Sequence, residues 1–361
     1  MERSDMKVVD MHCDTITELW GKQENGIQTG LRKNDQMVNL ERLTKGGYLL
    51  QNFAIFVEQQ PGISSFDKAQ QIRSVFQREM KQNTDRIAMV TTIKGIEENE
   101  QAGKLSALLT VEGGEACEGS LEKLHVLYEQ GVRMMTLTWN YPNEIGYPNL
   151  PKHAVGFPYV PDTQHGLTPF GIECVKEMER IGMIIDVSHL SDAGFYDVLR
   201  YTKKPFVASH SNARAVCPWV RNLTDDMIRK LADRGGVTGL NFCGDFLLDP
   251  FADCNSREQI DKKVQNAEYK GYHAFAGSQA TFADIVRHAR HMINVGGIEC
   301  IGLGSDFDGI PDYPGCPRAD RMDDLAEAFH DAGFTPVEIE HIFYRNVLRL
   351  YHEIFPLAQR K

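Results

Sequence analysis

The sequence predicts an α/β fold of the (β/α)8 TIM-barrel type. Short runs rich in branched apolar residues alternate with longer amphipathic stretches, which is typical of repeated βα units around a parallel sheet. The chain has 361 residues, a length that such barrels reach with insertions while remaining one domain. We therefore expect a single barrel domain over residues 1–361.

Eight runs fit the barrel strands, because each is short and rich in branched residues. They are Val8–Met11, Gln51–Val57, Ser106–Val111, Val132–Thr138, Met183–Val187, Phe206–Ala208, Val237–Phe242 and Cys300–Gly304. A ninth run, Ile87–Thr91, is expected to lie outside the barrel.

Between these runs, apolar residues recur at spacings of three and four, as they do on one face of a helix. Ser120, Ser191 and Thr224 are expected N-caps, because each is followed by an acidic first turn. The predicted helices include Phe66–Gln82, Leu121–Gln130, Phe170–Ile181, Asp192–Tyr201, Asp225–Asp233 and Phe282–Val295, with closing helices over Thr335–Ile354.

Two long segments interrupt the alternation of strands and helices. Asn140–Gly166 follows the fourth strand and is rich in Pro, Gly and Asn, and Asp245–Gly277 follows the seventh strand. Loops after barrel strands lie at the mouth of the barrel, where long ones are often functional lids. We expect both segments to border a site.

Charge and composition disfavour several classes of partner. The formal net charge of −11 disfavours nucleic acid and anionic membranes, which both select basic surfaces. The first residues lack the apolar run of a secretory signal, and no stretch is long enough to span a membrane. The eight cysteines are scattered without a Cys-x-x-Cys pair, so we expect reduced thiols. These features favour a cytoplasmic enzyme.

Four polar islands stand at the ends of apolar runs, and they carry the functional prediction. Residues at the carboxyl ends of barrel strands converge, however far apart they lie in the sequence. The islands are Asp10–Asp14, Glu112–Gly114, Asp186–His189 and Ser209–Ser211, and Asp306 follows the eighth strand in the same way. Histidine and carboxylate side chains at such ends predict one metal site.

Five of these side chains can hold two zinc-like ions, namely His12, Asp14, Glu112, His189 and His210. His12 and Asp14 share one face of an extended segment, whereas Cys13 between them points to the other. Glu112 can offer one oxygen to each ion, so it is the expected bridging ligand. Two ions sharing a hydroxide would supply a nucleophile and polarise a carbonyl, with Asp306 as the candidate proton shuttle.

Other histidines and acids have a structural interpretation. We expect Asp308 to form a polar turn that closes the barrel, although a functional role is the alternative. The histidines expected to be hydrogen-bonded structural groups are His125, His288, His291 and His330.

The chain resembles the renal (membrane) dipeptidase family of zinc metallopeptidases, within the amidohydrolase-type barrels. The likeness runs from about Val8 to Tyr351. The motifs that carry it are Asp10-x-His-x-Asp14, Val111-Glu-Gly-Gly114, Gly166–Gly171, Asp186-Val-Ser-His189, Ser209-His-Ser211 and Gly304–Gly309, in this order. The resemblance implies one ion on His12, Asp14 and Glu112, and a second on Glu112, His189 and His210.

The same resemblance implies how a substrate is held. Arg221 is expected to bind the terminal carboxylate of a dipeptide, a role that suits a guanidinium fork. Asp306 is expected to contact the substrate amine and to handle a proton during cleavage. Relatives accept D-residues at the C-terminal position and are commonly homodimers, so both properties are expectations here.

This chain departs from the family at two positions. Trp139 stands where animal members carry a histidine that stabilises the oxyanion, and an indole N–H donates a hydrogen bond but carries no charge. Phe246 stands where some relatives have a tyrosine. Losing an oxyanion donor typically costs on the order of a hundredfold in turnover. The candidate substitutes in the following loop are Asn140, Asn143, His153 and His165.

Three functions stay open from the sequence. The first is a zinc dipeptidase that requires a free amine and a free carboxylate. The second is an amidohydrolase of other small amides, such as N-acyl amino acids or lactams. The third is a metal-binding relative whose catalysis faded with the change to Trp139. The same ligands also accept manganese, iron or cobalt.

Overall fold

The structure is a computed structural model that describes residues 6–150, 160–249, 251, 252, 254–256, 258, 259, 262, 280–311, 315 and 318–355. Within them, parallel strands form a sheet in the order β2-β1-β9-β8-β7-β6-β5-β4, and pairing of β2 with β4 closes it into a barrel. The strands are β1 (Val8–Asp10), β2 (Tyr48–Phe56), β3 (Ile87–Val90), β4 (Leu105–Glu112), β5 (Val132–Thr136), β6 (Ile184–Asp186), β7 (Val207–Ala208), β8 (Val237–Leu240) and β9 (Ile301–Leu303).

The eight predicted barrel strands are therefore confirmed, and so is the position of the ninth. β3 pairs only with β4, over Leu105–Leu108, whereas β5 pairs with β4 from Leu109 onward. Both strands thus share one edge of β4 at different heights, and β3 stays outside the closed ring.

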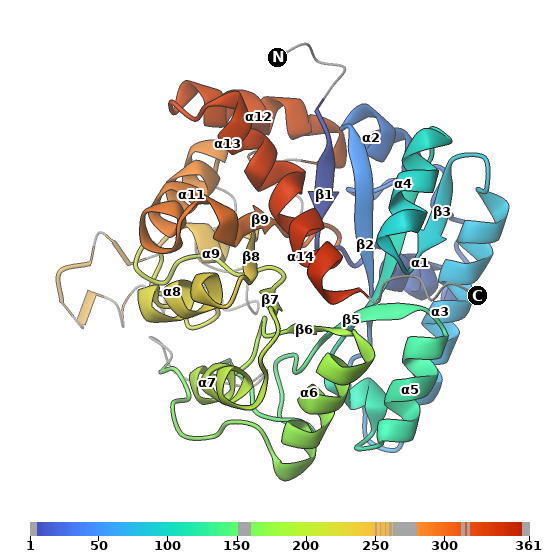
Figure 1. Ribbon diagram of the computed structural model, residues 1–361, viewed down its shortest axis with the longest axis horizontal. Helices are drawn as coiled ribbons and strands as arrows, with labels where there is room; N and C mark the ends of the chain where they lie inside the picture. The colour runs from blue at the N-terminus through green and yellow to red at the C-terminus, as the bar shows by residue number, and fades with distance from the viewer. Residues whose placement is uncertain are drawn as a thin grey trace.

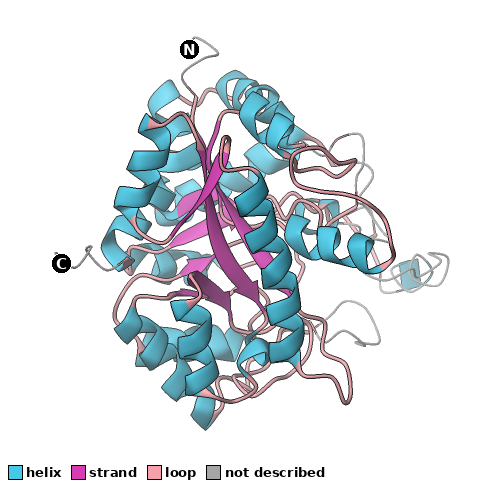
Figure 2. Ribbon diagram, turned by 90° about the vertical axis from the view of Figure 1, so that its right-hand side faces the viewer, coloured by secondary structure: helices cyan, strands magenta, loops and turns pink. Residues whose placement is uncertain are grey.

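Helices surround the strands (Figure 1), and the turned view shows a twisted core of strands with helices around it (Figure 2). The α-helices are α1 (Thr15–Glu24), α2 (Leu40–Lys45), α3 (Ser65–Gln82), α4 (Ile93–Gln101), α5 (Leu121–Glu129), α6 (Pro169–Ile181), α7 (Asp192–Tyr201), α8 (Asp225–Asp233), α9 (Gly244–Leu247), α11 (Phe282–Gly296), α12 (Met322–Asp331), α13 (Pro336–Glu340) and α14 (Asn346–Ile354). Three short 3-10 helices are η1 (Gly114–Cys117), η3 (Ile298–Cys300) and η4 (Ala319–Arg321), and η5 (His341–Arg345) is a π-helix.

The predicted N-caps are confirmed. The side chains of Ser120, Ser191 and Thr224 accept hydrogen bonds from backbone N–H groups three residues later, at 3.3, 2.9 and 3.2 Å. Each cap satisfies a donor that the first helical turn leaves without an internal partner. The helices therefore begin where the sequence places them.

The closing helices complete the barrel core. The interior residues Val9, Leu108 and Val237 form one apolar cluster with Leu350 and Tyr351 of α14. Asn52 of β2 donates a hydrogen bond to the Tyr351 hydroxyl at 2.7 Å. α14 thus packs on the inner side chains, while the carboxyl ends of the strands carry the loops that form the site.

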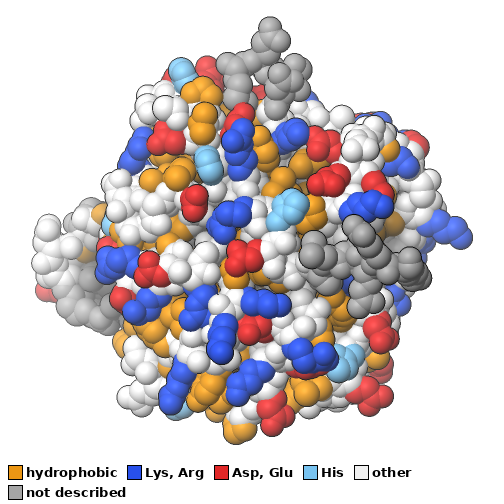
Figure 3. Space-filling model, viewed as in Figure 1, with side chains coloured by type: hydrophobic (Ala, Val, Ile, Leu, Met, Phe, Trp, Pro, Cys, Tyr) orange, Lys and Arg blue, Asp and Glu red, His pale blue; other side chains and the backbone are white. Residues whose placement is uncertain are grey.

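The two long loops are described in part. In 140–166, residues 151–159, including His153, lie outside the described residues, and most of 250–279 does so as well. No helix among the described residues has the length and apolar character needed to cross a membrane. Each cysteine in that part of the chain is a free thiol, as predicted. On the face seen in Figure 3, acidic side chains lie among the basic ones.

Candidate active site

Six predicted side chains converge at the carboxyl ends of the strands. They are His12 and Asp14 after β1, Glu112 at the end of β4, His189 after β6, His210 after β7 and Asp306 after β9. His12 and His210 are each 1% exposed, and the acids and His189 line a cavity of about 210 Å³. The structure therefore brings the polar islands together at one end of the barrel.

Glu112 lies between two groups of ligand atoms. Its Oε2 is 3.4 Å from Nε2 of His12, whereas its Oε1 is 3.0 Å from Nε2 of His189 and 3.8 Å from Nε2 of His210. His12 Nε2 also lies 3.3 Å from Asp14 Oδ2. Each Glu112 oxygen thus faces different histidines, which is the geometry a bridging carboxylate requires.

The tautomers of His189 and His210 follow from their outer contacts. His189 Nδ1 donates to Asn140 Oδ1 at 2.8 Å. The Ser209 hydroxyl donates its only proton to Asp186 at 2.6 Å, so it accepts from His210 Nδ1 at 2.7 Å. Both Nε2 atoms then carry lone pairs, and they face each other at 3.0 Å.

This arrangement fits a cation. Two lone pairs at 3.0 Å repel, and a positive ion near both removes the repulsion. Burial lowers the pKa of His189 and of His210 well below the usual value, and the charges of Arg221 and His12 add to this effect. Both imidazoles are therefore neutral, which is the form that binds metal.

The acids point to the same conclusion. Burial, followed by the charge of Asp14, raises the pKa of Glu112 to about 8. Burial alone would lower the pKa of His12, but the carboxylates of Glu112 and Asp14 raise it well above its usual value. Asp14 Oδ1 is buried without a hydrogen-bond partner. Crowded buried carboxyl groups with an unused oxygen are a donor set for divalent ions.

Ligand atoms of His12, Glu112 and His210 lie within 4.8 Å of one another, and so do those of His12, Asp14 and Asp306. Asp306 Oδ1 is 3.8 Å from His12 Nε2, and Asn241 donates to Asp306 Oδ2 at 2.9 Å. His189 and Asp306 have φ angles of 70° and 64°, in the left-handed region that non-glycine residues rarely adopt. Such strain is typical of residues held in place for a function.

Two buried aspartates, Asp10 and Asp186, hold the segments that carry the candidate metal ligands, and neither was among the predicted site residues. Asp186 accepts from the Thr136 hydroxyl at 2.6 Å as well as from Ser209. Asp10 accepts from the Ser305 hydroxyl at 2.6 Å and from the Ser305 N–H at 2.9 Å. Their position at strand ends, two or three residues before a histidine, is the signal that could have identified them.

Arg221 lines the same cavity and is 4% exposed. Its guanidinium donates to Ser211 Oγ at 3.3 Å and to the His210 carbonyl at 3.4 Å, and lies 5.3 Å from the centre of the Phe246 ring. A buried cation at the wall of a small cavity can bind an anionic group. Phe246 adds an apolar surface but no hydroxyl.

Trp139 and Asn140 also line this cavity. The indole packs against Phe56, with ring centroids 4.9 Å apart, and its centroid lies 6.3 Å from that of His189. Of the suggested substitute donors that the structure describes, which leaves out His153, only Asn140 lines the cavity. Asn143 is engaged by Glu115 and Leu137, and His165 is exposed and contacts Asp162.

The residues interpreted as structural lie apart from the cluster. Asp308 is the exception, since it lines the cavity beside Asp306. It accepts from the Thr15 hydroxyl at the start of α1 and from the Met37 N–H, both at 2.7 Å, so it also connects these two segments as a polar turn would. His288 bonds to Ala213 N–H and Leu247 O, and His291 pairs with Asp225. His125 pairs with Glu177, and His330 lies near Asp331. The Cys13 thiol donates to Asn52 O, away from the ligands.

Comparison with known proteins agrees with this geometry. Residues 3–361 match the family described as membrane dipeptidase (peptidase family M19). An uncharacterised dipeptidase of Schizosaccharomyces pombe is 31% identical over 365 residues, covering 96% of this chain and 80% of the relative. Among solved structures, the metallopeptidase dipeptidase AC of family M19 has a TM-score of 0.83 at 26% identity, covering 97% of this chain and 99% of its own.

A metallopeptidase from Rhodobacter sphaeroides, solved with a phosphinate mimic of the dipeptide L-Ala-D-Ala, has the same TM-score of 0.83 at 25% identity and the same coverage. The predicted barrel and the predicted family are both confirmed. The chain belongs to the membrane dipeptidase family of metallopeptidases, peptidase family M19.

Proposed function

We propose that this protein is a binuclear metal-dependent dipeptidase that hydrolyses the peptide bond of free dipeptides. The observation that carries the proposal is Glu112, whose two oxygens face two separate histidine groups. One ion would be held by His12, Asp14 and Glu112, and the other by Glu112, His189 and His210. Two zinc ions suit this donor set of three imidazoles and two carboxylates.

When bound, such ions lower the pKa of a water molecule and polarise the scissile carbonyl. The chain itself supplies orientation and proton handling. Burial raises the pKa of Asp306 to about 6, so this carboxyl can hold or release a proton near neutral pH. Because Asn241 holds Oδ2 of Asp306, Oδ1 is left toward His12 and the cavity.

Substrate selection follows from opposite charges in a small space. Arg221 would bind the free carboxylate of a dipeptide, and Asp306 would bind its free amine. The cavity of about 210 Å³ suits a small ligand, and Trp139 forms one of its walls. Trp139 carries no charge, so a hydrogen bond from its indole N–H is the oxyanion contact it can offer.

Acceptance of a C-terminal D-residue is part of the proposal. It is supported by the Rhodobacter sphaeroides relative, which binds a mimic of L-Ala-D-Ala in its structure. Homodimer formation, a cytoplasmic location and a single-domain organisation stay predictions from the sequence.

The test is hydrolysis of a panel of L-L, L-D and Gly-D dipeptides with their N-acetylated and C-amidated forms, by zinc-loaded and apo protein. We expect metal-dependent cleavage of the unblocked dipeptides alone. Hydrolysis of N-acetylated substrates without hydrolysis of free dipeptides would favour the amidohydrolase alternative. Bound zinc without any turnover would select the weakly catalytic relative, to which the change at Trp139 points.

A further inference from the structure

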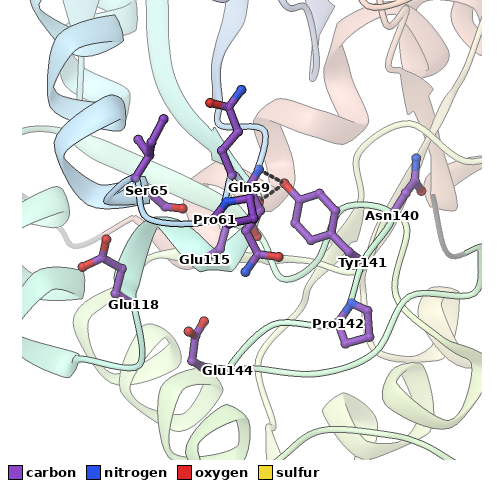
Figure 4. Close-up of a pocket in the computed structure, with 11 residues that line it drawn as sticks. Gln59, Pro61, Ser65, Glu115, Glu118, Asn140, Tyr141, Pro142 and Glu144 are labelled. Carbon is purple, nitrogen blue, oxygen red and sulfur yellow. Dashed lines mark hydrogen bonds between the residues drawn. The ribbon is translucent and has the colours of Figure 1, made fainter. Parts of the chain in front are cut away.

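Beside the active site, the loops after β2, β4 and β5 enclose a second hollow of about 760 Å³ (Figure 4). Asn140 lines this hollow and the smaller active-site cavity as well. Glu115 also lines the hollow, although it is 1% exposed. The side-chain hydrogen bonds of the Glu115 carboxyl are with Tyr141 and Asn143, neither of which is basic, so the deep burial of this acid calls for a physical explanation.

The hydrogen bonds around Glu115 can be counted proton by proton. The Tyr141 hydroxyl lies 2.8 Å from Glu115 Oε1 and 2.7 Å from the Gln59 backbone nitrogen (Figure 4). It also lies 2.9 Å from the Val57 carbonyl oxygen. Gln59 N–H can only donate, so the hydroxyl accepts there. The single phenolic proton cannot then serve both the Val57 carbonyl and a Glu115 carboxylate.

A neutral carboxylic acid resolves the conflict. Protonated Glu115 donates to the Tyr141 oxygen, and Tyr141 donates to the Val57 carbonyl, so that each group has a partner. The other oxygen, Oε2, accepts from Asn143 Nδ2 at 3.0 Å. The orientation of Asn143 is fixed because its Oδ1 accepts from the N–H groups of Ile145 and Gly146.

The surroundings agree with a neutral acid. Burial, the largest effect, raises the pKa of Glu115 to about 7, although hydrogen bonds with Asn143, its own N–H and Tyr141 lower it, and the nearby charge of Glu144 raises it further. The acid is therefore mostly neutral below pH 7. Gly113 leaves room for the carboxyl group, since a Cβ atom there would lie 2.2 Å from Glu115 Oε1. The side chain is therefore packed directly on the glycine that follows the bridging Glu112.

Glu115 contacts both Tyr141 and Asn143, which lie in the segment that also carries Trp139 and Asn140. Asn140 Oδ1 in turn accepts a hydrogen bond from His189 Nδ1. The proton is then on Nδ1, so His189 Nε2 carries a lone pair, and this atom faces Glu112. We propose that Glu115 is a positioning residue, kept as a neutral acid, which fixes residues 139–143 so that Asn140 sets the tautomer of His189. The inference rests on the proposed metal site and adds to it a residue that touches no ligand atom.

The experiment measures zinc affinity of the apo protein by competition with a chromophoric chelator, without any substrate. Glu115→Gln replaces the acid by a neutral isostere, whose amide donates to Tyr141 and whose oxygen accepts from Asn143. We expect its zinc affinity to stay within about twofold of the wild type. Glu115→Ala and Asn140→Ala should each weaken binding of one ion about tenfold or more, as loss of an outer partner of a metal ligand does.

Glu144→Gln is the matched control, because Glu144 lines the same hollow but is exposed. It should leave zinc affinity unchanged. Equal weakening by Glu115→Gln and Glu115→Ala would overturn the neutral-acid assignment, and wild-type affinity in a folded Glu115→Ala protein would overturn the positioning role. If Glu115→Ala fails to fold, Tyr141→Phe takes its place with the same expected loss.

These outcomes differ from failure of the proposed function. Absence of zinc binding in the wild type would contradict the metal site itself. The protonation of Glu115 would still be tested, because unfolding of the apo protein as a function of pH compares the wild type with Glu115→Gln. Wild-type zinc binding with an unchanged Glu115→Ala variant would contradict this inference alone.

Discussion

The protonation state of Glu115 gives a quantitative prediction for the pH dependence of stability. The pKa of this carboxyl is raised from 4.5 to about 7 by burial in the folded protein. Below pH 4.5 both the folded and the unfolded states hold the proton. Between pH 4.5 and 7 the unfolded chain releases it while the folded protein keeps it, so the free energy of unfolding falls as pH rises. Above pH 7 this contribution is constant.

The magnitude follows from the shift of about 2.5 units between 4.5 and about 7. At about 1.4 kcal/mol per unit, the full loss is about 3 kcal/mol. Glu115→Gln has no proton to release and keeps the neutral hydrogen bonds. We therefore expect the variant to gain about 2 to 3 kcal/mol over the wild type between pH 5 and pH 8.

Urea unfolding of apo wild type and Glu115→Gln at several pH values measures this difference. Other groups titrate in both proteins, so the comparison isolates the effect of position 115. A difference that is flat with pH would refute the neutral acid. A wild type that gains stability over the variant as pH rises would mean that the ionised carboxylate is the form the fold favours.

Three further variants test other parts of the account. Glu112→Gln should abolish binding of the second ion and turnover together, measured by metal analysis and dipeptide hydrolysis; retention of both ions would contradict the bridging role. Arg221→Met should raise KM for free dipeptides roughly ten- to hundredfold, the range for loss of a charged hydrogen bond, and an equal effect on C-amidated substrates would exclude carboxylate binding. Thr224→Ala should lower the free energy of unfolding by about 1 kcal/mol through loss of the α8 cap, with Thr224→Ser restoring it; no change on urea unfolding would show that the cap is unimportant.

Much of the fold could be predicted because the pattern of branched runs and amphipathic stretches is strong. The ends of two strands differ from the prediction. β5 ends at Thr136 and β8 at Leu240, two residues before the predicted ends. Leu137 and Phe242 remain fully buried beyond the last paired residues, so apolar composition continues after the strand pairing stops. The sequence pattern indicates which residues are buried, and burial extends further along the chain than the hydrogen-bonded pairing of the strands.

The convergence of the candidate ligands could also be predicted, since carboxyl ends of barrel strands meet by topology. The contacts that orient them could not. Asn140 reaches His189 across two loops, and Asn241 reaches Asp306 from a different strand end. Such pairs are remote in sequence and depend on loop conformation. The positive φ angles of His189 and Asp306 could not be predicted either, because glycine is the residue that usually indicates such an angle, and neither residue is a glycine.

The central claim is a binuclear site that acts on free dipeptides. The most direct measurement titrates apo protein with zinc while following bound metal and hydrolysis of one free dipeptide and its N-acetyl form. We predict two ions per chain, activity that appears as the sites fill, and turnover of the free dipeptide alone. Activity complete with one ion, or two bound ions without cleavage of the free dipeptide, would contradict the account.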